Sequence, residues 1–262
     1  MKLSIITINY NNAGGLERTF DSVVSQGYSG FEHIVIDGGS TDASIEVIKK
    51  YGQHVTYWVS EPDNGIYNAM NKGIGQTAGE YLLFLNSGDT LCRDANLKQL
   101  TGHLTGEDII YFNLEVCDTA NNNRFIKTYP DILDFKYFAE DSLPHMGSFI
   151  KRDLLVKYGG YSEKMKIVSD WAFFVDAVCL RHCTYRHVEG YFSTFYLDGT
   201  SSDAQNRRLL MTERDNHIAS AYKLYDSLYK DWMNKKQELY KPKISANVKF
   251  LKKTGLLKWL KR

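Results

Sequence analysis

The first hundred residues alternate between short apolar runs and apolar stripes at helical spacing. Residues 3–8 form a largely apolar run, as expected of a parallel strand buried on both faces. Leu16, Phe20 and Val23 then recur on one side of a predicted helix. The alternation continues with predicted strands at 31–37, 54–60 and 81–85 and predicted helices that carry 45–48 and 66–74. Each strand–helix unit is about 20–30 residues long, the scale of a parallel α/β crossover. The pattern predicts a mostly parallel α/β sheet with helices on both faces.

Beyond residue 105 the alternation weakens, but it still predicts further elements. A strand at 108–116 is expected to pair with 124–129 across a polar loop, and a helix is expected to begin near Asp170. Further predicted elements are a strand at 145–150, two short strands within 184–198 and helical segments from Asp203 onward. The chain has no internal repeat and no low-complexity linker. We therefore predict one domain over 1–202 and a helical C-terminal region over 203–262.

The charge distribution argues against a nucleic-acid-binding protein. Of the 262 residues 43% are hydrophobic and 24% are charged, and the formal net charge is +1. Residues 241–262 carry eight basic residues and no acidic one, which leaves residues 1–240 at −7. Because the positive charge is confined to this tail, we expect no nucleic-acid partner.

Cysteine usage and apolar run lengths predict the compartment. The four cysteines form no CxxC pair and no zinc-ligand spacing, as expected in a reducing compartment. The N-terminal apolar run is too short for a signal peptide, and no apolar stretch approaches the ~18–20 residues that span a bilayer. We expect a cytoplasmic protein. In the tail 241–262 leucines and Trp259 accompany the lysines, which favours contact with an anionic membrane surface over a solvated, frayed terminus.

Polar residues follow the predicted strands at their carboxyl ends, at 7–9, 37, 60–63 and 86–89. Parallel strands bring these ends to one edge of the sheet, where ligands bind in open α/β folds. The sequence has neither GxGxxG after its first strand nor GxxxxGK[ST], which argues against a dinucleotide site and a P-loop. Carboxylates at this edge suit ribose hydroxyls and Mg²⁺ or Mn²⁺, which bind through one or two carboxylates plus ligand phosphates.

Five ordered segments resemble the family 2 glycosyltransferases, most closely the bacterial members that assemble surface polysaccharides such as O-antigens. The resemblance extends over roughly residues 1–200. It is carried by TIN at 7–9, IDGGSTD at 36–42, EPDNGIYNAMNKG at 61–73, GEYLLFLNSGD at 79–89 and SDW at 169–171.

The resemblance implies a GT-A (Rossmann-like) fold, a nucleotide-diphosphate sugar donor, for which uridine is the commonest base, and inversion at the anomeric carbon. It divides the domain into a nucleotide-sugar half at 1–100 and an acceptor half at 101–202. Lys72 is either a partner of the donor diphosphate or an exposed helix lysine. The residues matched to donor binding are Thr7, Asn9, Asp37, Asp63, Asn71, Lys72 and Asn86.

The segment at 86–89 departs from the metal-binding pattern of that family, Asp-x-Asp. Here it reads Asn86-Ser87-Gly88-Asp89, so Asn86 is expected to contact ribose and Asp89 is the carboxylate left to bind Mn²⁺ or Mg²⁺. Alternatively, Asp89 caps a turn. Where some family members have a metal-binding histidine, the nearest candidate here is Asp198.

Asp170 matches the second position of the family's Glu-Asp motif, in which Ser169 replaces the Glu. The resemblance implies that Asp170 is the catalytic base, since single displacement needs a carboxylate that takes the acceptor's hydroxyl proton. A carboxylate favoured at a helix N-terminus would leave the same pattern. His145 and Trp171 are expected on the acceptor side.

Two other functions are compatible with the same pattern. A sugar-nucleotide nucleotidyltransferase also uses acidic metal ligands at a sheet edge, but the loop after the first strand has no basic residue before Arg18. The altered metal motif also allows a catalytically inactive nucleotide-sugar-binding protein. For a transferase, the expected partners are a nucleotide-diphosphate sugar and a lipid-linked saccharide acceptor.

Overall fold

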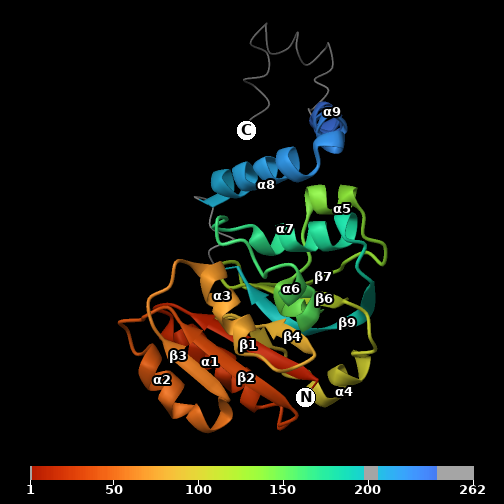
Figure 1. Cartoon of the computed structure of the whole chain (residues 1–262). Coiled ribbons are helices and arrows are strands. Elements are labelled where there is room, and N and C mark those ends of the chain that lie inside the picture. The colour runs from red at the N-terminus through yellow and green to blue at the C-terminus, as the bar shows by residue number, and fades with distance from the viewer. Residues whose placement is uncertain (1, 198–205, 241–262) are drawn as a thin grey trace, which may run out of the picture. The chain divides into compact units, whose positions relative to one another are not determined.

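The computed structural model describes residues 2–197 and 206–240 (Figure 1). Its contacts divide the chain into units 1–215 and 216–262. The described strands of the first unit form one mixed sheet of order β3-β2-β1-β4-β8-β6-β9-β5, with β7 beside β6. The α/β class with flanking helices is confirmed. The sheet is parallel from β3 to β4 and at β6–β9, and its other pairings are antiparallel.

The N-terminal half forms as its apolar pattern predicts. Every residue of β1 is buried, because helices cover both faces of its sheet. On one face of the sheet, Val35 packs with Leu16 of α1 and Ile48 of α2. On the other face, Ile6 of β1 and Ile36 of β2 lie against α3. The elements are β1 (Leu3–Asn9), α1 (Ala13–Val24), β2 (Phe31–Asp37), α2 (Ser44–Lys50), β3 (Tyr57–Ser60), α3 (Ile66–Gly75) and β4 (Tyr81–Phe84).

The second half extends this sheet. The predicted pairing of 108–116 with 124–129 is confirmed as the β6–β7 hairpin. The helix expected near Asp170 begins at Ser169. The elements are β5 (Thr90–Leu91), α4 (Leu97–Leu100), β6 (Ile109–Asp118), β7 (Asn123–Lys127), α5 (Phe135–Glu140), β8 (Ser148–Lys151), α6 (Arg152–Lys157), α7 (Ser169–Val175) and β9 (Tyr185–Tyr196).

Four predicted strands differ in extent from those in the structure. Residues 184–198 were expected to form two short strands, but β9 is a single strand. Its pairing with β6 shifts register near Gly190, whose φ of +100° permits a bulge where a turn was expected. The strands expected at 54–60 and 145–150 are shorter, because 52–54 and 145–147 form 3₁₀ turns.

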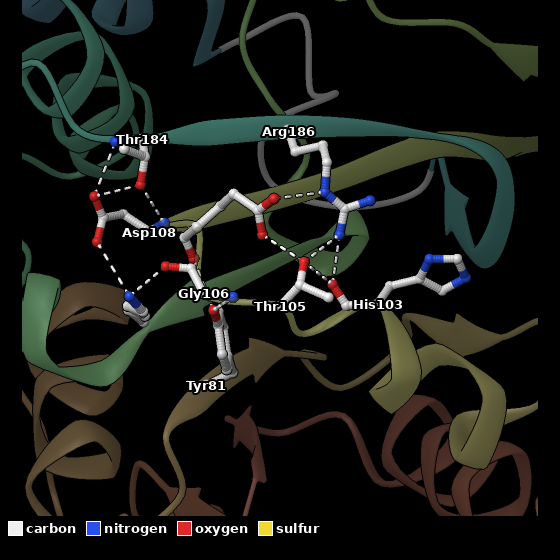
Figure 2. Close-up of polar contacts among 9 residues, drawn as sticks. Tyr81, His103, Thr105, Gly106, Asp108, Thr184 and Arg186 are labelled. Atoms are coloured by element: carbon white, nitrogen blue, oxygen red, sulfur yellow. Dashed lines mark hydrogen bonds and ion pairs between the residues drawn. The ribbon is translucent and has the colours of Figure 1, made fainter.

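A polar network closes the edge of the sheet at which β4, β6 and β9 begin (Figure 2). Asp108 accepts hydrogen bonds from the Thr184 amide at 2.8 Å and from its hydroxyl at 2.9 Å. Arg186 donates to Glu107 at 2.9 Å, and the Tyr81 hydroxyl donates to the Glu107 carbonyl at 2.8 Å. No predicted site residue belongs to this network. Its role is to join the strands of the two halves.

The C-terminal part of the described chain is helical, with α8 (Arg207–Ala221) and α9 (Lys223–Tyr240). The division predicted at 202/203 stays a prediction. Asp198 and the basic tail 241–262 lie outside the described residues. Among the helices of the described chain, none has the length and apolar character needed to cross a membrane.

Candidate active site

A cavity of about 510 Å³ opens at the carboxyl ends of the parallel strands. Residues from both halves line it, from the end of β1 and the turn after β4 to the 3₁₀ turn at 145–147 and the start of α7. Six residues predicted from sequence meet there. They are Asn9, Asp63, Asn86, Asp89, His145 and Asp170.

Asp37 lies beneath this cavity, fully buried, and does not line it. Its carboxylate accepts hydrogen bonds from the hydroxyls of Ser40 and Ser60, both at 2.6 Å, and from the Asn9 amide at 2.7 Å. Burial acts to raise the pKa of Asp37, but these hydrogen bonds outweigh it and lower the pKa. Asp37 is therefore an ionised anchor for the loop after β2. The Oδ1 of Asn9 is buried without a partner among the described residues.

Three other predicted donor residues contact protein groups. The Thr7 hydroxyl donates to the Leu85 carbonyl at 2.8 Å, inside the sheet. Asn71 exchanges two 2.8 Å hydrogen bonds with the Tyr161 backbone, which ties α3 to the second half of the sheet domain. Lys72 pairs with Glu61 at 2.7 Å. None of the three lines the cavity. Their contact with a donor stays a prediction.

The Asp170 carboxylate is held between two side chains. The Tyr67 hydroxyl donates to its Oδ1 at 2.8 Å, and His145 Nδ1 lies 3.5 Å from its Oδ2. Burial acts to raise the pKa of Asp170, but the hydrogen bond and charge of His145, with the Tyr67 hydrogen bond, lower it. Asp170 is therefore an anion at neutral pH, as a general base must be.

His145 connects Asp170 with Asp89, because its Nε2 lies 3.7 Å from Asp89 Oδ2. Burial acts to lower the pKa of His145, but hydrogen bonds to Asp170 and Asp89 and their charges raise it to about 9. A protonated ring donates from both nitrogens. The Asn86 amide, 3.1 Å from Nε2, would then turn its Oδ1 toward the ring. That rotation also gives a partner to Oδ1, which is buried and unpaired in the present orientation within the described chain.

The turn at 86–89 determines which groups can hold a cation. It is closed by a 2.9 Å bond from the Asp89 amide to the Asn86 carbonyl, with Gly88 at a φ of +107°. Residues 2–197 and 206–240 contain no cluster of three His, Cys, Asp or Glu side chains placed to hold a metal ion. Asp89 is the carboxylate of this turn that lines the cavity, so a hard cation held here would complete its shell with ligand phosphates and water.

Sequence reasoning missed two residues of this cavity. Tyr67 was passed over because it adjoins the apolar stripe of α3, yet its buried hydroxyl reaches Asp170. Asn12 was missed although Asn is a strong N-cap residue, a signal that could have marked it. Its side chain caps α1 and also donates to the Ser87 carbonyl at 3.1 Å, which fixes the turn at 86–89. Trp171, by contrast, is buried, and its indole donates to the Phe138 carbonyl at 2.7 Å.

Comparison with protein families and curated proteins identifies similar sequences. Residues 4–163 match the family model described as glycosyl transferase family 2. An uncharacterized glycosyltransferase of Mycobacterium tuberculosis is 35% identical over 178 residues, which covers 67% of this chain and 68% of that protein. A PGL/p-HBAD biosynthesis glycosyltransferase of Mycobacterium bovis is 29% identical over 176 residues, or 65% of this chain and 67% of that protein.

Solved structures share the fold at low sequence identity. S. aureus TarS 1-349 in complex with UDP-GlcNAc has a TM-score of 0.63 at 17% identity, covering 87% of this chain and 76% of that one. The mannosyltransferase PcManGT from Pyrobaculum calidifontis, in complex with GDP-Man and Mn²⁺, has a TM-score of 0.62 at 16% identity. This match covers 85% of this chain and 64% of the mannosyltransferase chain. These likenesses support the expected GT-A-type fold.

Proposed function

The chain belongs to glycosyl transferase family 2, and we propose that it transfers a sugar, with inversion, from a nucleotide-diphosphate sugar to a lipid-linked saccharide during bacterial surface glycan synthesis. The observation that carries this proposal is the Asp170 carboxylate, which lines the cavity with its side chain 21% exposed and is held between Tyr67 and His145. A uridine diphosphate sugar is the proposed donor. The likeness in fold to TarS, whose complexes contain UDP and UDP-GlcNAc, supports this choice.

Asn9 and Asp63 contribute to donor binding from the nucleotide-sugar half. Both line the cavity, and the Asp63 carboxylate is an acceptor for a ribose hydroxyl or a nucleobase N–H. Asp89 would hold a Mn²⁺ or Mg²⁺ ion, which would neutralise charge on the diphosphate. The complex of PcManGT with GDP-Man and Mn²⁺ is consistent with such a metal.

Asp170 acts on the acceptor. Each of its oxygens keeps a lone pair beyond its contact with Tyr67 or His145. One oxygen takes the acceptor's hydroxyl proton while the new bond from that hydroxyl oxygen to the anomeric carbon forms. The bond from the anomeric carbon to the donor phosphate breaks at the same time, and the nucleoside diphosphate leaves with its electron pair. Attack from the face opposite the leaving group inverts the anomeric centre.

Substitution of Asp170 by Asn tests this role. The amide cannot accept the proton, so transfer to acceptor should fall by at least ~100-fold, the size of a general-base contribution. Affinity for the donor should stay within a few-fold of wild type, as measured by titration calorimetry with UDP-GlcNAc and GDP-Man. Nucleoside diphosphate release in the presence of a bacterial lipid extract reports transfer. Unchanged transfer by Asp170→Asn would remove Asp170 from the mechanism.

A further inference from the structure

A second cavity, here called the apolar chamber, adjoins the first cavity at Asp170 and His145. Its volume is about 370 Å³, and Asp170 and His145 line both this chamber and the 510 Å³ cavity described above. The two cavities also share Met146, Ile167 and Phe195. Asp170 and His145 therefore lie where the two cavities meet. If the donor occupies one of them, the group that carries the acceptor hydroxyl adjoins the other.

The walls of the apolar chamber consist mainly of aliphatic and aromatic side chains. Val116 of β6 and Phe125 of β7 are cross-strand partners, so their side chains share one face of the hairpin. Phe125 is 47% exposed, although an aromatic side chain of this kind is normally covered. Other apolar lining residues are Leu114, Leu143, Phe195 and Leu197.

Several polar groups at the chamber wall are engaged with protein, and the Arg214 guanidinium lies 4.8 Å from the centre of the Trp171 ring. Lys127 pairs with Asp141 at 2.7 Å, and the Ser142 hydroxyl donates to the Leu143 carbonyl at 3.1 Å. The indole N–H of Trp171 donates to a backbone carbonyl. A saccharide in this space would leave many of its hydroxyls without partners, which costs free energy. A hydrocarbon group has no hydrogen bonds to lose, and removal of its apolar surface from water is favourable in free energy.

We propose that the apolar chamber binds a hydrocarbon group bonded directly to the acceptor sugar, so that the acceptor is a short glycoside of a lipid. This inference rests on the proposed function, because it takes Asp170 as the base that faces the acceptor. It narrows the acceptor to one whose lipid lies within about one sugar ring of the reacting hydroxyl. The growing end of a long saccharide would place a polar ring in the chamber instead.

Titration calorimetry of the full-length protein with n-octyl β-glucoside and methyl β-glucoside, below the micelle concentration, tests the proposal. The two probes have the same sugar and differ only in the length of their alkyl group. Burial of even two or three methylene groups tightens binding by about tenfold or more, so octyl glucoside should bind at least tenfold more tightly. Equal affinities for the two glucosides would overturn the proposal.

Two neighbouring substitutions locate the binding. Phe125→Asp places a charge in the chamber wall and should weaken octyl glucoside binding at least tenfold. Ile126→Asp is the matched control, since Ile126 is 41% exposed on the same strand but pairs with Glu115 on the opposite face. It should leave octyl glucoside binding unchanged. Equal weakening in both variants would overturn the proposal. Should Phe125→Asp not fold, Leu197→Asp, also at an exposed apolar lining residue, replaces it.

Donor turnover separates this inference from the proposed function. Release of UDP from UDP-sugars without acceptor is measured for the wild type and Ile126→Asp, and equal release is expected. If neither binds nor cleaves any nucleotide sugar, the proposed function fails. If donor turnover is present but the chamber does not prefer the octyl glucoside, only the acceptor assignment fails.

Discussion

Replacing Tyr67 with Phe removes one hydrogen bond from the Asp170 carboxylate and keeps the aromatic ring. The bond is 2.8 Å long and Tyr67 is 5% exposed, so solvent does not readily replace the lost hydroxyl. A hydrogen bond to a charged group contributes about 1.5–3 kcal/mol, and 1.36 kcal/mol corresponds to one pKa unit. The His145 contact remains, so we take the lower value and expect the pKa of Asp170 to rise by about one unit.

The acid limb of kcat/KM against pH measures this change, because that limb reports the base of the free enzyme. Since the base must be deprotonated, a higher pKa moves the limb about one unit toward neutral pH. Tyr161→Phe is the control. Tyr161 is also buried, 5.7 Å from the Tyr67 ring, and its hydroxyl has no partner within the described chain. An unmoved limb in Tyr67→Phe, or an equal shift in Tyr161→Phe, would refute the reasoning.

Three further predictions concern stability and the metal. Burial lowers the pKa of His33 from 6.5 to about 4. His33 is therefore protonated below about pH 6.5 in the unfolded chain, but only below about pH 4 in the folded chain. The free energy of unfolding, measured with urea, should therefore fall by about 2 kcal/mol between pH 7 and pH 5. His33→Gln should make this fall smaller. The same dependence of unfolding free energy on pH in both proteins would contradict the role of His33. A Cβ on Gly73 would lie 2.6 Å from Ile6 Cγ2. Gly73→Ala should therefore lower the free energy of unfolding by about 1–2 kcal/mol, because this overlap costs more than the higher helix propensity of Ala gains. Gly75→Ala in the same helix meets nothing within 4 Å and should be neutral or slightly stabilising by thermal unfolding; equal effects would count against this packing argument. Asp89→Asn should raise the Mn²⁺ concentration for half-maximal UDP release at least ~10-fold, and an unchanged Mn²⁺ response would show that Asp89 holds no metal.

The local pattern predicted the elements of residues 1–100 well, because these elements depend on short-range regularities. Buried parallel strands are continuous apolar runs, and the helices between them carry stripes at helical spacing. The strand predicted at 31–37 is β2 at those bounds. Prediction was weaker beyond residue 105, where parallel and antiparallel pairings are mixed. The bulge near Gly190 depends on pairing with a distant strand, and residues 184–198 alone do not determine it.

The sequence by itself determined which polar residues stand at the ends of the parallel strands, and it placed Asp170 at the start of a helix. Tertiary structure decided which of them meet. Tyr67 and Asp170 are 103 positions apart, and their hydrogen bond forms only because α3 and α7 pack beside one cavity. The position of His145 between two carboxylates and the exposed face of Phe125 likewise depend on how the second half completes the sheet. Such contacts depend on the direction of each side chain in three dimensions, which spacing along the chain does not specify.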